Sequence, residues 1–471
     1  MIRRPLALAL ALAALPSAAF AEDLLQTYEL ARNSDPQFSA AEAGRLATKE
    51  GAVQARAALL PQLNGSASLT RSRTNSEDEQ IVTDDGVFEG DVETDSRSRN
   101  YGVNLDQAVV DFSRINSLRS QRALSTAADF TLDSAGDSLI TRTSAAYFNV
   151  LVAIETLAAA QAQEAALKKQ FDFADKRLEV GLAPITDVHE ARAQYDSARA
   201  NTIVTRNALE DAYQALTEIT GGDIRTLKGL PEDFAPELPP QQDVDGWVTS
   251  AIESNPALKA AEHQVRSAEA DVSTAKAGHL PTLYLQGSYG DTKNWGETTL
   301  DTTGELLRDL DSKSESRSLG LVLNVPIFAG GATQSRVRQA IATRDVRQDE
   351  YEQQKRALVR NTRNAYQTLV AGISEVEARK AAVFSARSAY EASQVGLEVG
   401  TRTVLDVLQN QQTLFDAERE YALARYNFLQ NRLLLEQAAG TIEVASVQDI
   451  NRLLTVDAQA DLAMPPAEPP Q

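Results

Sequence analysis

One unit appears twice in this sequence, and no other feature constrains the fold as strongly. Residues 178–188 read LEVGLAPITDV, and residues 397–408 give the same frame as LEVGTRTVLDVL. An offset of 219 residues separates Gly181 from Gly400, and similar offsets relate other segments of the two halves. A repeat of this length in a chain of 471 residues predicts two fused copies of one extended unit, in place of several unrelated domains.

The shared frame is expected to form the tip of a helical hairpin in each copy, because a helical run ends at a glycine and another begins a few residues later. Long proline-free runs precede the two frames and predict helices over 113–178 and 332–396. At 1.5 Å per residue, each of these helices would span roughly 95 Å. Shorter returning helices are predicted over 186–220 and 403–439, with heptads of apolar residues along one side.

Each copy also carries a predicted strand hairpin ahead of its long helix. The first hairpin, over 61–110, begins with alternating apolar and polar residues, and the second lies over 281–328. Acidic loops over 75–95 and 291–314 are expected to separate strands of about 9 to 11 residues, the length of a tilted transmembrane strand. Alternation alone allows two interpretations, a membrane sheet or a soluble two-stranded ribbon lying on helices.

The remaining segments set the boundaries of the two copies. Residues 1–21 carry two arginines, an apolar run and the sequence Ala-Phe-Ala, a pattern typical of a cleaved secretory signal. The first copy is then expected over 22–229 and the second over 249–440, joined by a proline-rich connector at 230–248. Residues 441–471 are predicted to form a short segment followed by a disordered, proline-rich tail.

Composition excludes several classes of function. The chain has 46 basic and 66 acidic residues and a net charge of −20, so it would repel a nucleic-acid backbone. It has no cysteine, and therefore neither a disulfide nor a cysteine for a lipid anchor. Its three histidines lack the spacing of metal ligands, and it holds no phosphate-binding loop, nucleophile elbow or dinucleotide fingerprint. We therefore predict no catalytic, cofactor or metal site and no enzymatic activity.

Four strands per chain raise a geometric problem if they lie in a membrane. They cannot close a barrel, and an open edge in lipid leaves backbone groups unsatisfied at several kcal/mol each. Insertion would therefore require several chains, although their number does not follow from the sequence. Two other classes stay open, a secreted structural filament of coiled coils and a periplasmic enzyme on a helical scaffold. The paired hairpins argue against the filament, and the absence of a catalytic constellation argues against the enzyme.

Motifs spread over the whole sequence carry a resemblance to a known family. They are the Asp-Pro and Asn-Pro helix starts at 35–36 and 255–256, the LPxL strand starts, the segment PIFAGG at 326–331, and the runs AYFNVL, VGLAPITDV, VGTRTVLDVL and ARYNFL. With these residues the chain resembles outer-membrane efflux proteins of the TolC family.

The resemblance implies a mostly α fold with a membrane β-barrel and two internal structural repeats, assembled as a homotrimer. Four strands from each chain would close a twelve-stranded barrel. The long helices would form a second, α-helical barrel in the periplasm. The segment after 441 would belong to a mixed girdle at the equator of this trimeric α/β-barrel duct.

The same resemblance implies a passive exit duct that catalyses no reaction. The trimer would lie in the cell outer membrane, in contact with its lipid, and extend into the periplasm. There it would dock with a periplasmic membrane-fusion adaptor and an inner-membrane pump of the RND, ABC or MFS type. It would conduct drugs, small toxic molecules or secreted proteins, as in type I secretion. The alternative is a secreted coiled-coil filament with no channel activity.

In this family the helical tips coil inward and close the periplasmic end, so the tips are the predicted gate. By resemblance, Arg402 takes the place of the family's linking arginine, and Thr186 and Asp187 take the places of its acceptors. Asp406 matches an acidic ring at the pore entrance, where three carboxylates around one axis would hold a cation and disfavour anions. Partly exposed ion pairs contribute about 0 to 1 kcal/mol each, so such links would yield to a docking partner.

A purely structural interpretation of the tip residues stays open. Thr403 with Asp406 has the spacing of a helix-capping box, as does Asp187 with Glu190. Arg402 would then be a solvated loop residue.

The chain departs from the best-known members of the family at two tip positions. Leu397 stands where they place a tyrosine link, and Gln409 stands where they place a second acidic ring. These departures predict a looser closed state and weaker capture of cations.

Overall fold

The structure is a computed structural model that describes residues 23–83, 86–182, 184–238, 243–300, 303 and 305–459. The predicted leader and the end of the predicted tail lie outside these residues. The chain divides into two compact units. The first comprises Met1–Gly44, Asp129–Lys259 and Glu352–Gln471, and the second comprises Arg45–Ala128 and Ala260–Tyr351.

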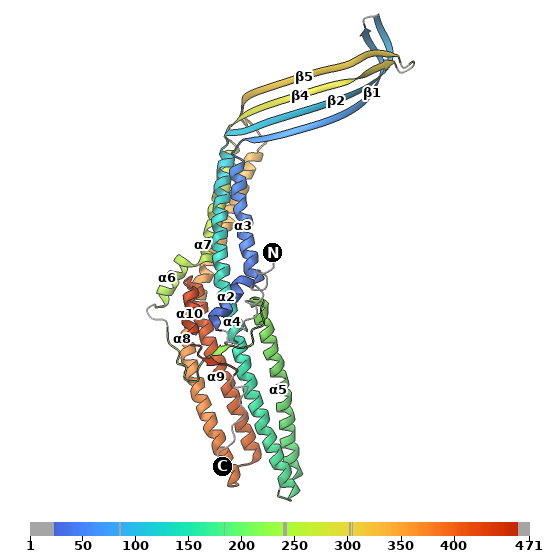
Figure 1. Ribbon diagram of the computed structural model, residues 1–471. Helices are drawn as coiled ribbons and strands as arrows, with labels where there is room; N and C mark the ends of the chain where they lie inside the picture. The colour runs from blue at the N-terminus through green and yellow to red at the C-terminus, as the bar shows by residue number, and fades with distance from the viewer. Residues whose placement is uncertain are drawn as a thin grey trace, which may run out of the picture. The chain divides into compact units, whose positions relative to one another are not determined.

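Two copies of one element order make up the chain (Figure 1). The helices are α2 (Leu24–Ser34), α3 (Pro36–Ala57), α4 (Phe112–Glu179), α5 (Ile185–Thr220), α6 (Val244–Ser254), α7 (Pro256–Ala277), α8 (Ala332–Glu398), α9 (Val404–Ala439) and α10 (Val444–Asn451). The strands are β1 (Gln62–Thr83), β2 (Gly86–Val110), β3 (Lys228–Gly229), β4 (Thr282–Leu300), β5 (Leu306–Asn324) and β6 (Val456–Asp457). The order α2-α3-β1-β2-α4-α5 recurs as α6-α7-β4-β5-α8-α9, which confirms a mostly helical fold with two structural repeats.

In the first unit, each returning helix ends against the pair of short helices that opens its own repeat. Gly221 follows α5 with φ 68°, and a Cβ placed there would lie 3.0 Å from the side chain of Ser34. Gly440 follows α9 with φ 69°, and its Cβ would lie 2.6 Å from the backbone of Asn255. Only glycine adopts this backbone conformation readily and leaves room for so close an approach.

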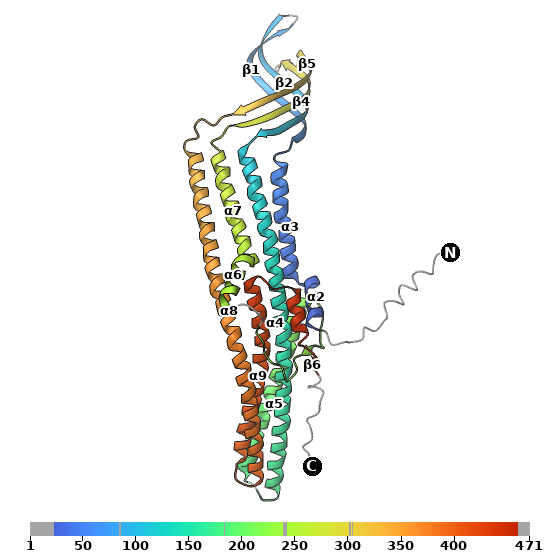
Figure 2. The same cartoon turned by 90° about the vertical axis from the view of Figure 1, so that its left-hand side faces the viewer.

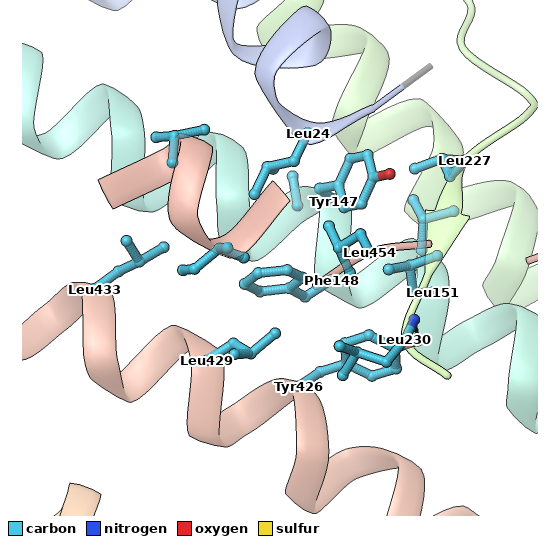
Figure 3. Packing of buried hydrophobic residues seen from close by; sticks show 14 of the residues in the cluster. Leu24, Tyr147, Phe148, Leu151, Leu227, Leu230, Tyr426, Leu429, Leu433 and Leu454 are labelled. Carbon is cyan, nitrogen blue, oxygen red and sulfur yellow. Dashed lines mark hydrogen bonds between the residues drawn. The ribbon is translucent and has the colours of Figure 1, made fainter. Parts of the chain in front are cut away.

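The core of the first unit lies where α4 and α9 meet the segment that follows α5 and contains β3, called here the strap. Figure 3 shows Tyr147 and Phe148 of α4 beside Leu429 of α9 and Leu227 of the strap, all of them buried. The hydroxyl of Tyr147 donates to the carbonyl of Lys228 and accepts from its N–H, both at 2.9 Å. These two hydrogen bonds fasten β3, which pairs antiparallel with β6, to the middle of α4.

One helix in the described part of the chain, α4, is long and apolar enough by length and composition to cross a membrane. Its most apolar stretch is 56% buried inside the protein. A core helix passes the same test, and α4 supplies the fully buried side chains of Tyr147, Leu151 and Ile154 to the core.

The second unit contains one antiparallel sheet in the order β1-β2-β4-β5, which curls along its length (Figure 2). The hairpins of the two repeats are joined edge to edge by the pairing of β2 with β4. The alternative of two-stranded ribbons lying on helices is therefore wrong, because all four strands form a single sheet.

The two faces of this sheet differ in chemistry. Successive residues of a strand point to opposite faces, so paired residues form rows across the sheet. One row consists of Leu63, Leu105, Gly287 and Leu319, and the next row consists of Asn64, Asn104, Ser288 and Ser318. The leucines at the two edges of the first row are 70% and 74% exposed. One face is thus apolar in this region, and the other carries small uncharged polar groups.

The strands are 22, 25, 19 and 19 residues long, so the prediction of 9 to 11 residues was wrong. Most of the two acidic segments predicted as loops belongs to the strands. Ion pairs between neighbouring strands hold these segments together: Arg71 Nε donates to Asp95 at 3.0 Å, and Lys313 Nζ lies 3.3 Å from Asp291. Because charged cross-strand pairs stabilise a sheet without apolar alternation, a search for alternation misses them.

Candidate functional site

The predicted gate residues lie at the tips of two helical hairpins in the first unit, α4 with α5 and α8 with α9. Both turns are closed by glycine in the left-handed conformation, Gly181 with φ 76° and Gly400 with φ 77°. In both, a backbone N–H after the glycine returns to the last turn of the preceding helix, from Leu182 to Arg177 O at 2.8 Å and from Thr401 to Gly396 O at 2.8 Å. The repeated sequence frame therefore forms the same kind of helix end twice.

Asp406 forms the first turn of α9 together with Thr403. The Thr403 hydroxyl accepts from the Asp406 N–H at 3.2 Å, and the Asp406 carboxylate accepts from the Thr403 N–H and hydroxyl, both at 2.9 Å. This is the predicted capping box. The hydrogen bonds from Thr403 and the nearby charge of Arg402 hold the pKa of Asp406 below its usual value. The carboxylate is therefore anionic, and one of its oxygens, Oδ1, accepts none of these bonds.

Asp187 occupies the equivalent position in α5 but has a different setting. Here α5 begins at Ile185, and Pro184 is its N-cap without a side-chain hydrogen bond. The predicted capping box of Asp187 with Glu190 is therefore wrong, because the helix begins before Asp187 and places it in the first turn. Within the residues the structure describes, the side chain of Asp187 forms no hydrogen bond or ion pair, and neither does that of the exposed Thr186.

Arg402 is exposed and crosses over a glycine of the neighbouring helix. Its backbone N–H donates to Gly396 O at 3.1 Å. A Cβ at Gly396 would lie 2.6 Å from Arg402 Cγ, so this glycine makes room for the aliphatic stem of the arginine. In the described part of the chain, no hydrogen bond or ion pair engages the guanidinium. Arg402 is thus close to the charge of Asp406 on its own tip, and no such bond joins it to Thr186 or Asp187.

The two hairpins meet through α4 and α9 above their tips. Leu167 of α4 and Leu408 of α9 belong to a small buried cluster, and the side chains of Gln163 and Gln412 are hydrogen bonded across the same pair of helices. Leu397 is half-buried and Gln409 is exposed, and the described residues offer no side-chain hydrogen bond to Gln409. Within a single chain, the tips are therefore held together behind their ends, by apolar packing and by the hydrogen bond between Gln163 and Gln412.

A buried polar cluster near the middle of the first unit did not figure in the sequence predictions. Arg425 of α9 donates to Glu155 of α4 at 2.6 Å and to the carbonyl of Pro231 at 3.2 Å. Tyr426 donates to the same carboxylate at 2.8 Å, and burial, followed by the charge of Glu155, raises the pKa of this tyrosine. The cluster fastens the start of the connector to both helices. Arg425 and Tyr426 lie in the run ARYNFL, which marks the family resemblance but gives no indication of a partner in α4.

No group of three or more His, Cys, Asp or Glu residues is placed to hold a metal ion in the described ranges. The tips offer charge and hydrogen-bonding groups at the ends of the hairpins.

Comparison with known proteins identifies what the chain is similar to. The family described as outer membrane efflux protein matches residues 27–222 and 247–441, which correspond closely to the two repeats. Outer membrane protein TolC of Escherichia coli strain K12 is 35% identical over 96% of this chain and 89% of that protein. The alkaline protease secretion protein AprF of Pseudomonas aeruginosa is 29% identical over 91% of this chain and 87% of its own length.

Solved structures show the same fold at lower sequence identity. The CmeC outer membrane channel of Campylobacter jejuni superposes with a TM-score of 0.71 at 18% identity, covering 92% of this chain and 90% of that one.

Proposed function

Because this chain belongs to the outer membrane efflux protein family, we propose how its copies build and gate an exit duct. The protein is an outer-membrane exit duct for efflux and secretion, and the observation that carries this conclusion is a family match through both repeats. Its relatives are channel proteins and not enzymes. A secreted filament without channel activity is not supported, since the similarity to TolC extends over 96% of the chain.

The membrane part of the duct is a closed barrel formed by three chains, each supplying four strands. The contrast between the two faces of the sheet supports this proposal. An exposed row that includes Leu63 and Leu319 suits contact with lipid, and the neighbouring row of Asn and Ser residues suits a water-filled interior. Closure would satisfy the open edges of β1 and β5, which lipid cannot do.

The helical hairpins form the periplasmic part of the duct. Tripartite assembly with an adaptor and a pump is supported by the relatives, which include a protease secretion protein as well as TolC. We infer that the adaptor is a periplasmic membrane-fusion protein and that the pump is an inner-membrane protein of the RND, ABC or MFS type. Long hairpins whose tip side chains Thr186, Asp187 and Arg402 have no bonding partner within the described ranges suit this docking.

The gate consists of Arg402, Thr186 and Asp187, with Asp406 as the acidic ring at the entrance. Each of the first three side chains is without a hydrogen-bonding partner among the described residues of its own chain, so all three are available to a neighbouring hairpin. Asp406 serves its capping box with Oδ2, which leaves Oδ1 available to a cation. The structural and the gating interpretations of Asp406 are therefore compatible.

Single-channel conductance in a planar bilayer tests this proposal. Arg402→Ala removes the link that closes the tips, so we expect a several-fold larger conductance than that of the unmodified protein. Asp406→Asn removes the charge of the ring, so we expect the preference for cations to fall. Arg192→Ala is the matched control, because it deletes an exposed arginine of α5 whose ion pair among the described residues is with Asp196 at 3.8 Å.

The outcomes separate the gate from the duct. If Arg402→Ala conducts like the unmodified protein and like Arg192→Ala, the duct stands and its gate lies elsewhere. If the folded, inserted protein forms no channel even with these substitutions, the assignment as a duct fails.

A further inference from the structure

Within one chain, the two strand hairpins are joined where β2 pairs with β4. A cluster of three polar side chains, called here the polar lock, lies beside this joint. At this joint Val110 lies opposite Leu283. Immediately beyond, the hydroxyl of Tyr284 donates to Asp111 at 2.6 Å. Arg114 completes the lock, 3.3 Å from that carboxylate and with its guanidinium 5.4 Å from the centre of the tyrosine ring.

The equivalent position in the second repeat, at the outer edge of the sheet after β5, carries an exposed apolar segment. Strand β5 is an edge strand, and the chain continues from it as an irregular segment to α8 (Figure 2). In this segment Ile327 is 94% exposed and Phe328 is 88% exposed, among the highest values of any large apolar side chain in the described residues. Gly330 and Gly331, with φ 59° and 83°, then turn the chain into the helix. So much apolar surface just beyond the end of an edge strand, which finishes at Asn324, indicates a missing partner.

The internal repeat identifies that partner and its register. The β2 sequence SRNYGVNL matches the β5 sequence SRSLGLVL with an offset of 218 residues, so Val110 corresponds to Phe328. The β1 start LPQL matches the β4 start LPTL with an offset of 220, so Leu283 corresponds to Leu63. The partner of β5 should therefore be the free edge of β1 in a second copy, and the Val110–Leu283 pair becomes Phe328 opposite Leu63.

We infer that β5 of one copy pairs with β1 of a second copy in this register, and that Ile327 and Phe328 form an apolar lock at the seam. The inference rests on the proposed trimeric duct and adds the residues of its seam. The same register pairs Leu321 with Leu69 of the second copy, the counterpart of the pair Val103 and Tyr289 within one chain. Leu321 is 66% exposed and Leu69 is 74% exposed in the single chain.

The polar lock cannot recur at the seam, which explains the apolar residues. The positions equivalent to Asp111, Tyr284 and Arg114 are Ala329, Asn64 and Ala332. None of these carries a charge or a phenol. The seam between chains is thus stabilised by burial of Phe328 and Ile327, whereas the joint within a chain is stabilised by a charged hydrogen-bonded group.

Cysteine cross-linking tests the register directly, because the natural chain has no cysteine. We expect the double variants Phe328→Cys/Leu63→Cys and Leu321→Cys/Leu69→Cys to form disulfides between chains under mild oxidation. Paired strands hold opposing Cα atoms about 4.5 to 5.5 Å apart, within the range of a disulfide. The matched control is Leu321→Cys/Leu63→Cys, which lies on the same face but about 20 Å out of register. Cross-linked dimers and trimers on denaturing gels without reductant are the readout.

The outcomes distinguish the seam from the duct. If the control pair cross-links as well as the matched pairs, or if none cross-links in an oligomer that resides in the outer membrane and conducts, the register is wrong and the duct stands. If the protein is neither oligomeric nor inserted, the trimeric duct fails and the seam fails with it.

A second variant tests the lock apart from the register. We expect Phe328→Ala to lower by several degrees the temperature at which the oligomer dissociates in detergent. Val109→Ala, which shortens the side chain that corresponds to Ile327 in the joint within one chain, should change that temperature less. An unchanged dissociation temperature for Phe328→Ala would overturn the lock.

Discussion

The residue between the first two helices of each repeat, Asp35 or Asn255, has a chemically different long-range partner in the two copies. In the first repeat, the carboxylate of Asp35 accepts from Arg142 of α4 at 2.7 Å. The equivalent positions in the second repeat are Asn255 and Asn361, so the charge pair is missing. Asn255 instead donates to two carbonyls of the last turn of α9, at 3.2 and 3.4 Å. A charged link between neighbouring helices in one copy is thus a neutral cap on a helix end in the other.

Both copies retain the local role of this residue, which is to cap the helix that follows it. Asp35 accepts from the N–H of Phe38 at 2.8 Å, and Asn255 accepts from the N–H of Leu258 at 3.1 Å, so each begins the helix that follows it. The cap depends only on neighbours in the sequence, and both Asp and Asn satisfy it. The tertiary partner depends on α4 in one copy and α9 in the other, and it has diverged. Local structure is therefore the conserved part of this comparison.

The largest expected effect comes from Gly440→Ala, which disrupts the close contact between the end of α9 and Asn255. The substitution adds strain at φ 69° and drives a Cβ to within 2.6 Å of the Asn255 backbone, which cannot move without displacing α7. We expect a loss of about 3 kcal/mol or more in the free energy of unfolding. Denaturation in detergent, followed by circular dichroism, measures it.

Gly400→Ala is the control for this substitution. It has almost the same backbone angle, φ 77°, but nothing lies within 4 Å of the added Cβ. It should therefore cost only the strain of the left-handed conformation, about 1 to 2 kcal/mol. Equal losses for the two variants would show that the close approach at Gly440 contributes nothing.

A smaller effect is expected from Asp35→Asn, which gives the first repeat the residue found in the second. The amide keeps the cap on α3 but leaves Arg142 without its carboxylate. Asp35 is 3% exposed and Arg142 is 31% exposed, so we expect a loss of about 2 kcal/mol, below the range for a fully buried pair. Asn361→Arg with Asn255→Asp is the reverse exchange. It should not add stability to the second repeat, because the Asn255 side chain donates to the carbonyls of Gln437 and Ala438, which an aspartate would repel.

The effect of Asp35→Asn should depend on pH. Burial alone raises the pKa of Asp35, but hydrogen bonds from Arg142 and from the N–H groups of Phe38 and Gln37 outweigh it and lower the pKa. A carboxyl whose pKa is lower in the folded state stabilises the fold above its unfolded pKa of about 3.9. That stability is lost as the pH falls through the folded value. The difference between the two proteins should therefore be full at pH 7 and shrink below about pH 4.

The element order of this fold could be predicted from the sequence because its signals are local. Glycine at the hairpin turns, proline at 36 and 256, and long runs without proline mark helix ends wherever they lie in space. The lengths of the strands could not be predicted in this way. Their outer halves are held by pairs such as Arg71 with Asp95, which lie 24 residues apart and show no periodicity. Only the register, a property of the folded sheet, brings such pairs together.

The residues of the candidate site show the same contrast between local contacts, which the sequence predicts, and long-range contacts, which it does not. The capping box of Thr403 and Asp406 was predicted correctly because its partners are three residues apart. The equivalent prediction for Asp187 was wrong because Pro184 starts the helix one turn earlier. Pairing of Arg402 with Thr186 or Asp187 stays a prediction, since it concerns neighbouring hairpins. The buried pair of Arg425 and Glu155, 270 residues apart, carries no spacing signal at all.

The smallest expected effect concerns the two tips, which differ at the residue that begins the returning helix. Thr403 caps α9 with its hydroxyl, and Pro184 begins α5 without a side-chain cap, although an aspartate follows three residues later in both. Thr403→Ala should therefore weaken the first turn of α9 by about 1 kcal/mol. Pro184→Thr should strengthen the first turn of α5 by a similar or smaller amount, because φ −72° and ψ 154° at Pro184 suit a capping threonine and Asp187 stands ready as its partner.

Amide hydrogen exchange at the two helix starts can resolve changes of this size, since about 1 kcal/mol corresponds to roughly fivefold in exchange rate. We expect the N–H of Asp406 to exchange faster in Thr403→Ala, and that of Asp187 to exchange more slowly in Pro184→Thr. Each variant serves as the other's control, because the unmodified tip should not change. If Pro184→Thr leaves exchange at Asp187 unaltered, then the two tips differ by more than this one residue. The missing cap would then reflect the geometry of the α4–α5 turn itself and not the absence of a hydroxyl.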